Sequence, residues 1–260
     1  MEGWGKERIL KERYKHFYTF TNFLIFDIET VKDTKMLEDI GSKKEQEKAK
    51  NGEFLPIPFH QVVSISWMIV KKKNVVEYVS YASSEEFKLI NLFWDAFRKS
   101  HSGKNGKIEN FPVLITFNGK DFDIPVLKIR TLRYIPSLDH KDFISIFFDK
   151  FDKWEDEYPT YSSKYSKYHV DLATDFFDRK VSLKKVCYLC GIPVKTEGDG
   201  SQIESWFYEE KLEKIARYCS EDVLAIAKLF SYINQHLLAN SYLFPSITDL
   251  DGLEASIHVE

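Results

Sequence analysis

Hydrophobic residues recur along this chain in short runs that predict strands, and longer amphipathic segments between them predict helices. Four runs, at 23–26, 62–70, 75–81 and 113–117, are rich in β-branched and aromatic residues, which is typical of strands. The second and third runs are joined by Lys71-Lys72-Lys73-Asn74, which predicts a β-hairpin. Apolar residues at helical spacing predict helices between 84 and the Ser-Gly-Lys-Asn-Gly loop at 102–106, after 124, over 182–190 and over 212–238.

The remaining segments divide the chain into one expected domain and its additions. We expect an N-terminal extension with a short solvated helix at residues 1–21. A single domain is expected over residues 22–240. Within it, 33–53 is rich in Lys and Glu and predicts a charged helix or a mobile insertion. Residues 241–260 predict an irregular C-terminal tail.

Composition sets broad limits on the class of protein. The chain has 260 residues, of which 43% are hydrophobic, enough for the core of one large α/β domain or two small ones. No run approaches the ~20 apolar residues of a membrane span, and the N-terminus lacks the apolar core of a secretion signal. Three cysteines do not suggest a disulfide framework. We therefore expect a cytoplasmic protein with no membrane partner. The net charge of −3 neither indicates nor excludes binding to nucleic acid.

The first predicted strand leads directly into two carboxylates, Asp27 and Glu29. Because side chains alternate along a strand, both project to the same side if the strand continues. Their mutual repulsion favours a bound hard cation such as magnesium. By itself the pattern is weak, since 40 acidic residues in 260 produce about six acidic-x-acidic pairs by chance.

Further carboxylates occur where other elements could bring them to this strand. Asp123 follows an Asn118-Gly119 turn at a strand-to-helix junction, and Tyr218 and Asp222 are neighbours on one face of the last long helix. Each has a simpler explanation: a turn cap for Asp27, a surface acid for Glu29, a helix N-cap for Asp123, and exposed helix neighbours for the last pair. The functional interpretation depends on their joint occurrence.

Taken together, the segments Asp27–Thr30, Asn118-Gly119-x-x-Phe122-Asp123-x-Pro125 and Tyr218-x-x-x-Asp222 resemble the three exonuclease motifs of the DEDD superfamily, in its tyrosine-bearing branch (DEDDy). The chain resembles the proofreading domain of family-B DNA polymerases. More narrowly, it resembles the stand-alone predicted 3′-5′ exonucleases related to that domain, which carry a stretch like 198–202. The resemblance spans about 22–235 and implies an α/β, ribonuclease H-like fold: a mixed sheet flanked by helices, with the hairpin strand antiparallel to its neighbours.

The resemblance also implies a metal-dependent mechanism. Two ions, Mg²⁺ or Mn²⁺, would be held by Asp27, Glu29, Asp123 and Asp222, with Asp27 bridging both, and Tyr218 would orient the attacking water. The implied activity is 3′-5′ exonucleolytic hydrolysis of single-stranded nucleic acid, releasing nucleoside 5′-monophosphates. DNA is favoured over RNA by resemblance alone. The alternatives are an exoribonuclease of the same branch and a nucleic-acid-binding module that has lost turnover.

Several residues have weaker functional interpretations. Thr30, Asn118 and Phe122 are expected to contact the substrate, although a tight turn also explains Asn118-Gly119. Aromatic and lysine residues are interspersed over 143–168, and this composition is suited to stacking on bases. The alternative is that the aromatic residues pack in the core. For the remaining candidates we expect packed or capping roles rather than metal or redox chemistry: Cys187, Cys190, His60 and His169.

Overall fold

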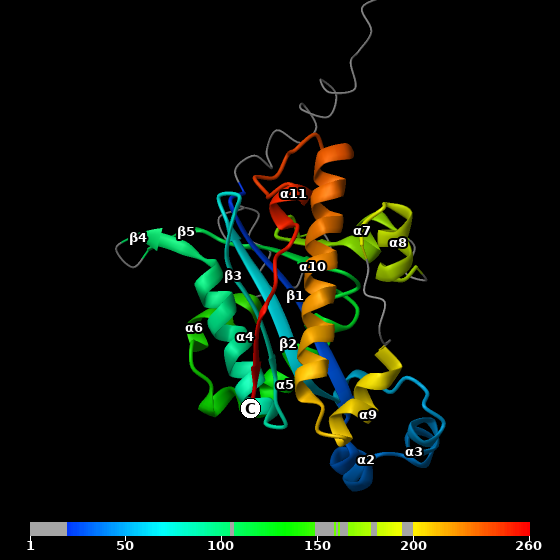
Figure 1. Ribbon diagram of the computed structural model, residues 1–260. Helices are drawn as coiled ribbons and strands as arrows, with labels where there is room; N and C mark the ends of the chain where they lie inside the picture. The colour runs from blue at the N-terminus through cyan, green and yellow to red at the C-terminus, as the bar shows by residue number, and fades with distance from the viewer. Residues whose placement is uncertain are drawn as a thin grey trace, which may run out of the picture.

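A six-stranded mixed sheet forms the centre of the molecule (Figure 1). The computed structural model describes residues 20–104, 107–148, 159, 161, 166–177, 181–193 and 200–260. The strands of the sheet are β1 (Asn22–Lys32), β2 (His60–Lys71), β3 (Asn74–Ala82), β6 (Val113–Thr116), β7 (His169–Asp171) and β8 (Ser256–Val259). Most of the expected extension at 1–21, most of the aromatic segment at 143–168 and part of 198–202 lie outside the described residues.

The strand order β7-β6-β1-β2-β3-β8 confirms the expected fold class. Strand β2 is antiparallel to both β1 and β3, whereas β1, β6 and β7 are mutually parallel. Five of these strands thus have the order and directions of a ribonuclease H-like sheet. At 102–106, where only a loop was expected, β4 (Ser102–Lys104) pairs with β5 (Lys107–Asn110) as a separate hairpin.

Helices cover both faces of the sheet. One face carries α4 (Glu86–Ser100), α5 (Asp123–Tyr134) and α6 (Lys141–Phe148). The other carries α7 (Leu172–Phe176), α8 (Leu183–Leu189), α9 (Ile203–Tyr208), α10 (Leu212–His236) and α11 (Ile247–Leu250), with α10 lying along the sheet in Figure 1. Single 3₁₀ turns occur at Ile57–Phe59, Ile135–Ser137 and Gly200–Gln202. None of the helices in the described part of the chain has the length and apolar character needed to cross a membrane.

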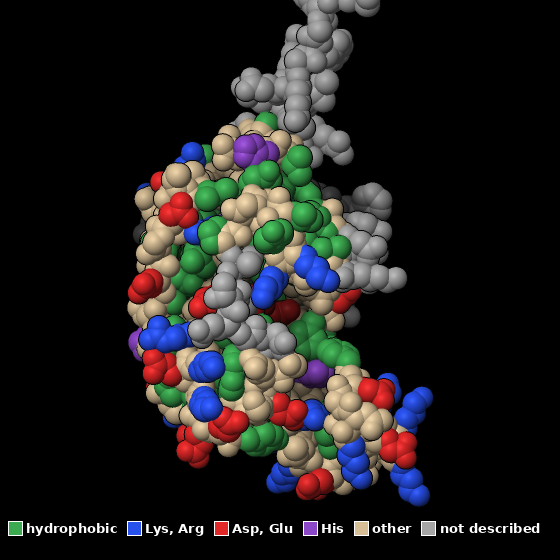
Figure 2. Space-filling model, turned by 45° about the vertical axis from the view of Figure 1, so that its right-hand side comes forward, with side chains coloured by type: hydrophobic (Ala, Val, Ile, Leu, Met, Phe, Trp, Pro, Cys, Tyr) green, Lys and Arg blue, Asp and Glu red, His purple; other side chains and the backbone are tan. Residues whose placement is uncertain are grey.

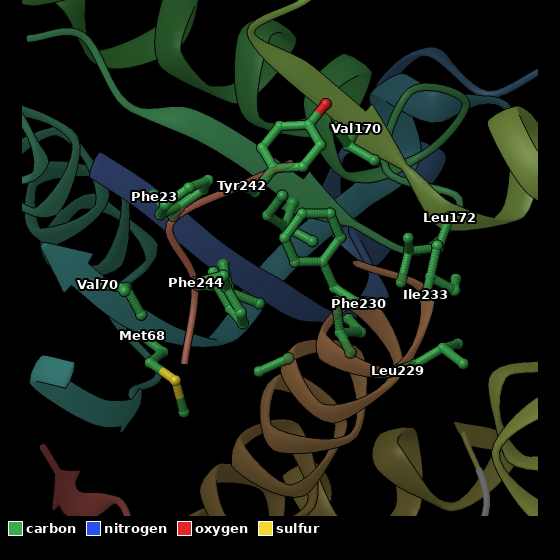
Figure 3. Packing of buried hydrophobic residues seen from close by; sticks show 14 of the residues in the cluster. Phe23, Met68, Val70, Val170, Leu172, Leu229, Phe230, Ile233, Tyr242 and Phe244 are labelled. Carbon is green, nitrogen blue, oxygen red and sulfur yellow. The ribbon is translucent and has the colours of Figure 1, made fainter. Parts of the chain in front are cut away.

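Strand β1 supplies side chains to both hydrophobic cores, as its alternation requires. Phe23 and Ile25 face α10, while Leu24 and Phe26 face α4 and α5. Figure 3 shows Phe23 beside the aromatic side chains of α10 and of the segment that follows it. The Phe23 and Phe244 rings are 5.1 Å apart between centroids, in an edge-to-face arrangement. This packing fixes α10 against the strand that carries the predicted metal ligands.

The expectation of an irregular tail at 241–260 is wrong. Tyr242 and Phe244 are buried in the core against α10, and α11 begins with a capping box from Ser246. Strand β8 then pairs in parallel with β3 at the edge of the sheet. A strand of four residues carries too little periodicity to be recognised without the edge it pairs with.

The charged insertion at 33–53 contains two short helices, α2 (Thr34–Ile40) and α3 (Lys43–Lys50). Helix α3 has no buried residue and begins with a capping box from Ser42, as expected for a solvated helix. Helix α2 is attached more firmly, because Leu37 packs with Leu55 and Phe59 in a small hydrophobic cluster. In Figure 1 both helices lie at the end of β1.

Candidate active site

The candidate site lies where β1 extends beyond its parallel neighbour. Strand β6 pairs with β1 only at Phe23–Ile25, whereas β2 remains paired with it as far as Lys32. Asp27 and Glu29 therefore stand on a part of β1 with one open edge. Their side chains are half-buried on the α10 side, opposite Ser66 and Ser64 of β2, and Ile28 between them is buried in the other core. The sheet thus presents two carboxylates on one face.

Helix α10 approaches this face closely because most side chains between it and β2 are small, and hydroxyl groups of β3 bond to its backbone. The Ser80 hydroxyl donates a 2.7 Å hydrogen bond to the carbonyl of Ala216, and the Tyr78 hydroxyl donates one of 2.7 Å to the carbonyl of Ser220. A bulky residue at these positions would push the helix away from the sheet. The small residues of the contact are Ser64, Ser66, Ser80, Ala216, Cys219 and Ser220.

The close approach brings the thiol of Cys219 to the carboxylates. Its Sγ lies 3.4 Å from the carbonyl oxygen of Asp27 and 3.8 Å from its Oδ2. One ligand atom from each of Asp27, Glu29 and Cys219 lies within 4.8 Å of the others. Burial raises the pKa of Cys219 well above its usual range, with the charges of Asp27 and Glu29 acting in the same direction. The thiol is therefore neutral and can donate a hydrogen bond, for which the main-chain carbonyl oxygen of Asp27 is the nearer acceptor.

Sequence reasoning did not single out Cys219. The only available signal was its position beside Tyr218, inside the Tyr-x-x-x-Asp motif. The other two cysteines lie elsewhere, on or at the end of α8. Cys187 is buried there, as expected, and burial raises the pKa of its thiol to about 12.

Asp123 enters the site from α5, of which it is the first residue. Its Oδ1 accepts a 3.2 Å hydrogen bond from the backbone N–H of Ile28, which joins it to the open edge of β1. Burial, together with the charges of Asp171 and Asp222, raises the pKa of Asp123 to about 7 against the opposing effect of its backbone hydrogen bonds. The carboxylate of Asp222 therefore lies close enough to Asp123 to interact with it.

The loop before Asp123 is organised by Asp171 at the end of β7. The backbone N–H groups of Asn118 and Lys120 each donate a 2.8 Å hydrogen bond to this buried carboxylate. Asn118 has a φ of 66°, in the left-handed region that asparagine tolerates. A Cβ on Gly119 would lie 2.6 Å from the side chain of Thr116, so only glycine fits. The tight turn expected at Asn118-Gly119 is thus present.

His169 has the packed role that the sequence predicted. Its ring is buried, and Nε2 lies 2.9 Å from the hydroxyl oxygen of Thr116. Burial lowers the pKa of His169 to about 3, so the ring is neutral at physiological pH. Asp171, two residues later, also caps α7 through the backbone N–H groups of Ala173 and Thr174.

Tyr218 and Asp222 are one turn apart on α10. The Tyr218 ring packs edge-on against Trp206 of α9, with 5.9 Å between ring centroids. It also borders the small hydrophobic cluster that contains Val31, close to the end of β1. The ring is therefore held between α9 and α10, on the same side of the sheet as Asp27 and Glu29.

Thr30 lies on the opposite side of β1 and is held by His60. The Oγ1 of Thr30 is 3.1 Å from Nδ1 of His60, and Nε2 of the same ring is 3.1 Å from the carbonyl oxygen of Leu55. Because a carbonyl can only accept, Nε2 carries the hydrogen, and Nδ1 of the neutral ring accepts from Thr30. Burial lowers the pKa of His60, which favours the neutral ring. The Phe122 ring lies 5.0 Å from that of His60.

The surface over this region is hollowed. Figure 2 shows acidic side chains inside the hollow, with hydrophobic and histidine side chains at its lower edge. Hard oxygen donors of this kind suit Mg²⁺ or Mn²⁺. Among the described residues, the cluster of Asp27, Glu29 and Cys219 is the one group of three possible ligand residues close enough to hold a metal ion.

Comparisons with known proteins give one family match. A family model described as a predicted 3′-5′ exonuclease related to the exonuclease domain of PolB matches residues 52–241. The matched region contains Asp123, Tyr218 and Asp222 and begins after Asp27 and Glu29. No curated protein sequence matches the chain.

Solved structures of exonuclease I resemble the fold at low sequence identity. The ligand-free enzyme has a TM-score of 0.41 and 12% identity over 86% of this chain and 44% of its own. E. coli exonuclease I in complex with a 5cy-dT13 oligonucleotide has a TM-score of 0.39 and 12% identity over 86% of this chain and 42% of its own. The chain therefore spans less than half the length of these proteins.

Proposed function

Because the chain belongs to the family of predicted 3′-5′ exonucleases related to the exonuclease domain of PolB, we propose that it removes nucleotides from the 3′ end of single-stranded DNA. The products are nucleoside 5′-monophosphates, and the reaction depends on two divalent cations, Mg²⁺ or Mn²⁺. The choice of DNA over RNA rests on the relation of the family to a DNA polymerase domain.

One observation carries the proposal: Asp27 and Glu29 project to one side of the open end of β1, and Asp123 of α5 is hydrogen-bonded to the same stretch of strand. Asp27 and Glu29 come from the strand itself, Asp123 is bonded to it, and the charge of Asp222 acts on Asp123. Burial, with the charges of Asp171 and Asp222 acting in the same direction, raises the pKa of Asp123, and a bound cation would favour its ionised form. We assign Asp27, Glu29, Asp123 and Asp222 as the metal ligands. When bound, two divalent ions supply an activated water and stabilise charge on the phosphate and on the leaving oxygen.

The neighbouring side chains have positioning roles in this proposal. The Cys219 thiol donates a hydrogen bond to the main-chain carbonyl oxygen of Asp27, which holds this part of β1 against α10. Packing against Trp206 restricts the Tyr218 ring, whose hydroxyl orients the attacking water. Tyr218 is not the base, because the reference pKa of a phenol is about 10.

The test is a cleavage assay with 5′-labelled single-stranded DNA and RNA in Mg²⁺, Mn²⁺ or chelator. The wild type is compared with Asp27→Asn, which removes one predicted ligand at nearly constant volume. Asp39→Asn, on the exposed surface of α2, is the matched control. We expect a 3′-end ladder that disappears with chelator and in Asp27→Asn but persists in Asp39→Asn.

The other outcomes distinguish the alternatives. Faster cleavage of RNA identifies an exoribonuclease, and binding without cleavage in either metal identifies a module that has lost turnover. Equal activity of Asp27→Asn and wild type overturns the assignment of the site.

A further inference from the structure

Phe54 places a large aromatic ring in solvent at the edge of the candidate site. Its side chain is 67% exposed, whereas the next residue, Leu55, is only 2% exposed and packs under the insertion. The Phe54 ring centroid lies 4.8 Å from that of His60 and 5.7 Å from that of Phe122. An isolated exposed phenylalanine needs no explanation, but this one forms an aromatic cluster with two residues of the site.

The cluster borders the site through Phe122, and its His60 ring lies on the face of β1 opposite to Asp27 and Glu29. Phe122 directly precedes Asp123, and His60 holds the hydroxyl of Thr30, the residue after Glu29. Because the Asp123 carboxylate accepts from the backbone N–H of Ile28, Phe122 and the ring of Phe54 beside it border the end of β1 that carries the predicted ligands.

The residues behind Phe54 are held firmly. The ring of His60 is bonded at both nitrogens, to Thr30 and to the carbonyl of Leu55, so the surface against which Phe54 packs is fixed. Lys32 donates a 3.0 Å hydrogen bond to the carbonyl of Ala49, which ties the end of α3 to β1.

A buried ion pair at the start of α2 holds the N-terminal end of the insertion. Asp33 caps this helix and accepts a 2.9 Å hydrogen bond from the guanidinium of Arg130 in α5. The insertion is thus anchored at both of its ends, and it presents Phe54 at the edge of the site.

We propose that Phe54, whose ring lies beside the expected substrate contact Phe122, adds a stacking surface for an unpaired base within the two 3′-terminal nucleotides. The inference rests on the proposed exonuclease function and deepens it, because it assigns a substrate role to the residue that follows the 33–53 insertion. Stacking on an aromatic ring is tolerant of sequence, since every base has a π-face. It requires that face to be free, so the surface selects ends that are single-stranded.

The test measures KM and kcat for Phe54→Ala, Phe54→Tyr and wild type on two DNA oligonucleotides. One oligonucleotide is ordinary, and the other has abasic sites at its two 3′-terminal positions. We expect Phe54→Ala to raise KM on the ordinary substrate by about 5- to 160-fold, the range for loss of one stacked base. Phe54→Tyr restores KM, and on the abasic substrate Phe54→Ala and wild type differ by less than about twofold.

Ile40→Ala is the matched control, because Ile40 lies in the insertion that precedes Phe54, is 69% exposed and carries no ring. Its KM is expected to equal that of wild type. An unchanged KM in Phe54→Ala, or an equal loss on both oligonucleotides, overturns the inference while leaving the proposed function intact. A wild-type chain that cleaves neither DNA nor RNA overturns the proposed function and the inference with it.

Discussion

Replacing Asp123 with asparagine tests whether this buried carboxyl group keeps its proton in the metal-free folded protein. It would do so because no positive charge among the described residues offsets its burial. Asp123 is only 5% exposed, and its pKa in the folded protein is about 7, against 3.8 for the unperturbed group. Between these values the folded state retains a proton that the unfolded state has lost. The free energy of unfolding therefore falls as pH rises through this interval, by about 1.4 kcal/mol per pH unit. Over the full interval the free energy of unfolding falls by at most about 4 kcal/mol.

Asp123→Asn removes this ionisation and keeps an oxygen that can accept from Ile28. The assay is urea unfolding of both proteins in chelator at pH 5, 6, 7 and 8. The stability of wild type minus that of the variant should decrease steadily from pH 5 to 7 and become constant above pH 7. A difference that does not change with pH shows that Asp123 is already ionised at pH 5 and refutes the reasoning.

Magnesium provides a second measurement on the same pair. A cation bound to the ionised carboxylate stabilises the folded state by mass action. At pH 8, Mg²⁺ should therefore raise the unfolding midpoint of wild type more than that of Asp123→Asn. Equal shifts would exclude Asp123 as a ligand.

Three further substitutions test the surrounding structure, each by urea unfolding. Gly119→Ala should destabilise the protein by about 1–3 kcal/mol, because its Cβ would overlap Thr116; wild-type stability would show that the loop can shift. Arg130→Met should cost about 3–5 kcal/mol, since it leaves the buried carboxylate of Glu86 without its ion pair. The double variant with Glu86→Gln should recover part of this loss, and no recovery would argue against the pairing. The pKa of His169 is about 3 in the folded protein, below the reference value of 6.5. Between pH 3 and pH 6.5 the unfolded chain therefore carries a proton on this ring that the folded protein lacks. Wild type should therefore lose about 2 kcal/mol relative to His169→Gln between pH 7 and pH 5. Parallel pH profiles would show that His169 titrates normally.

Local pattern was sufficient for the main elements of the fold. The alternation in β1 and the hairpin of β2 and β3 follow from side chains a few residues apart, and the sequence predicted both. The fold class followed from the three motifs through their resemblance to a family. The hairpin of β4 and β5 and the strand β8 were not predicted, because short strands are stabilised by the neighbours with which they pair.

The candidate site divides in the same way. The sequence was sufficient to select five candidate residues, because residue type, order and spacing can be read directly from it. They are Asp27, Glu29, Asp123, Tyr218 and Asp222. Their roles as ligands and as the water-positioning residue stay predictions.

Only the tertiary structure decided which groups meet at the end of β1. Cys219 reaches Asp27 across 192 residues of sequence, and Asp123 reaches Ile28 across 95. The raised pKa of Asp123, the control of its loop by Asp171 and the exposure of Phe54 beside His60 also depend on packing between distant segments. The sequence by itself determined which chemical groups the protein possesses and the elements that carry them. The distances and burial that determine their electrostatics arise only when the sheet and helices pack together.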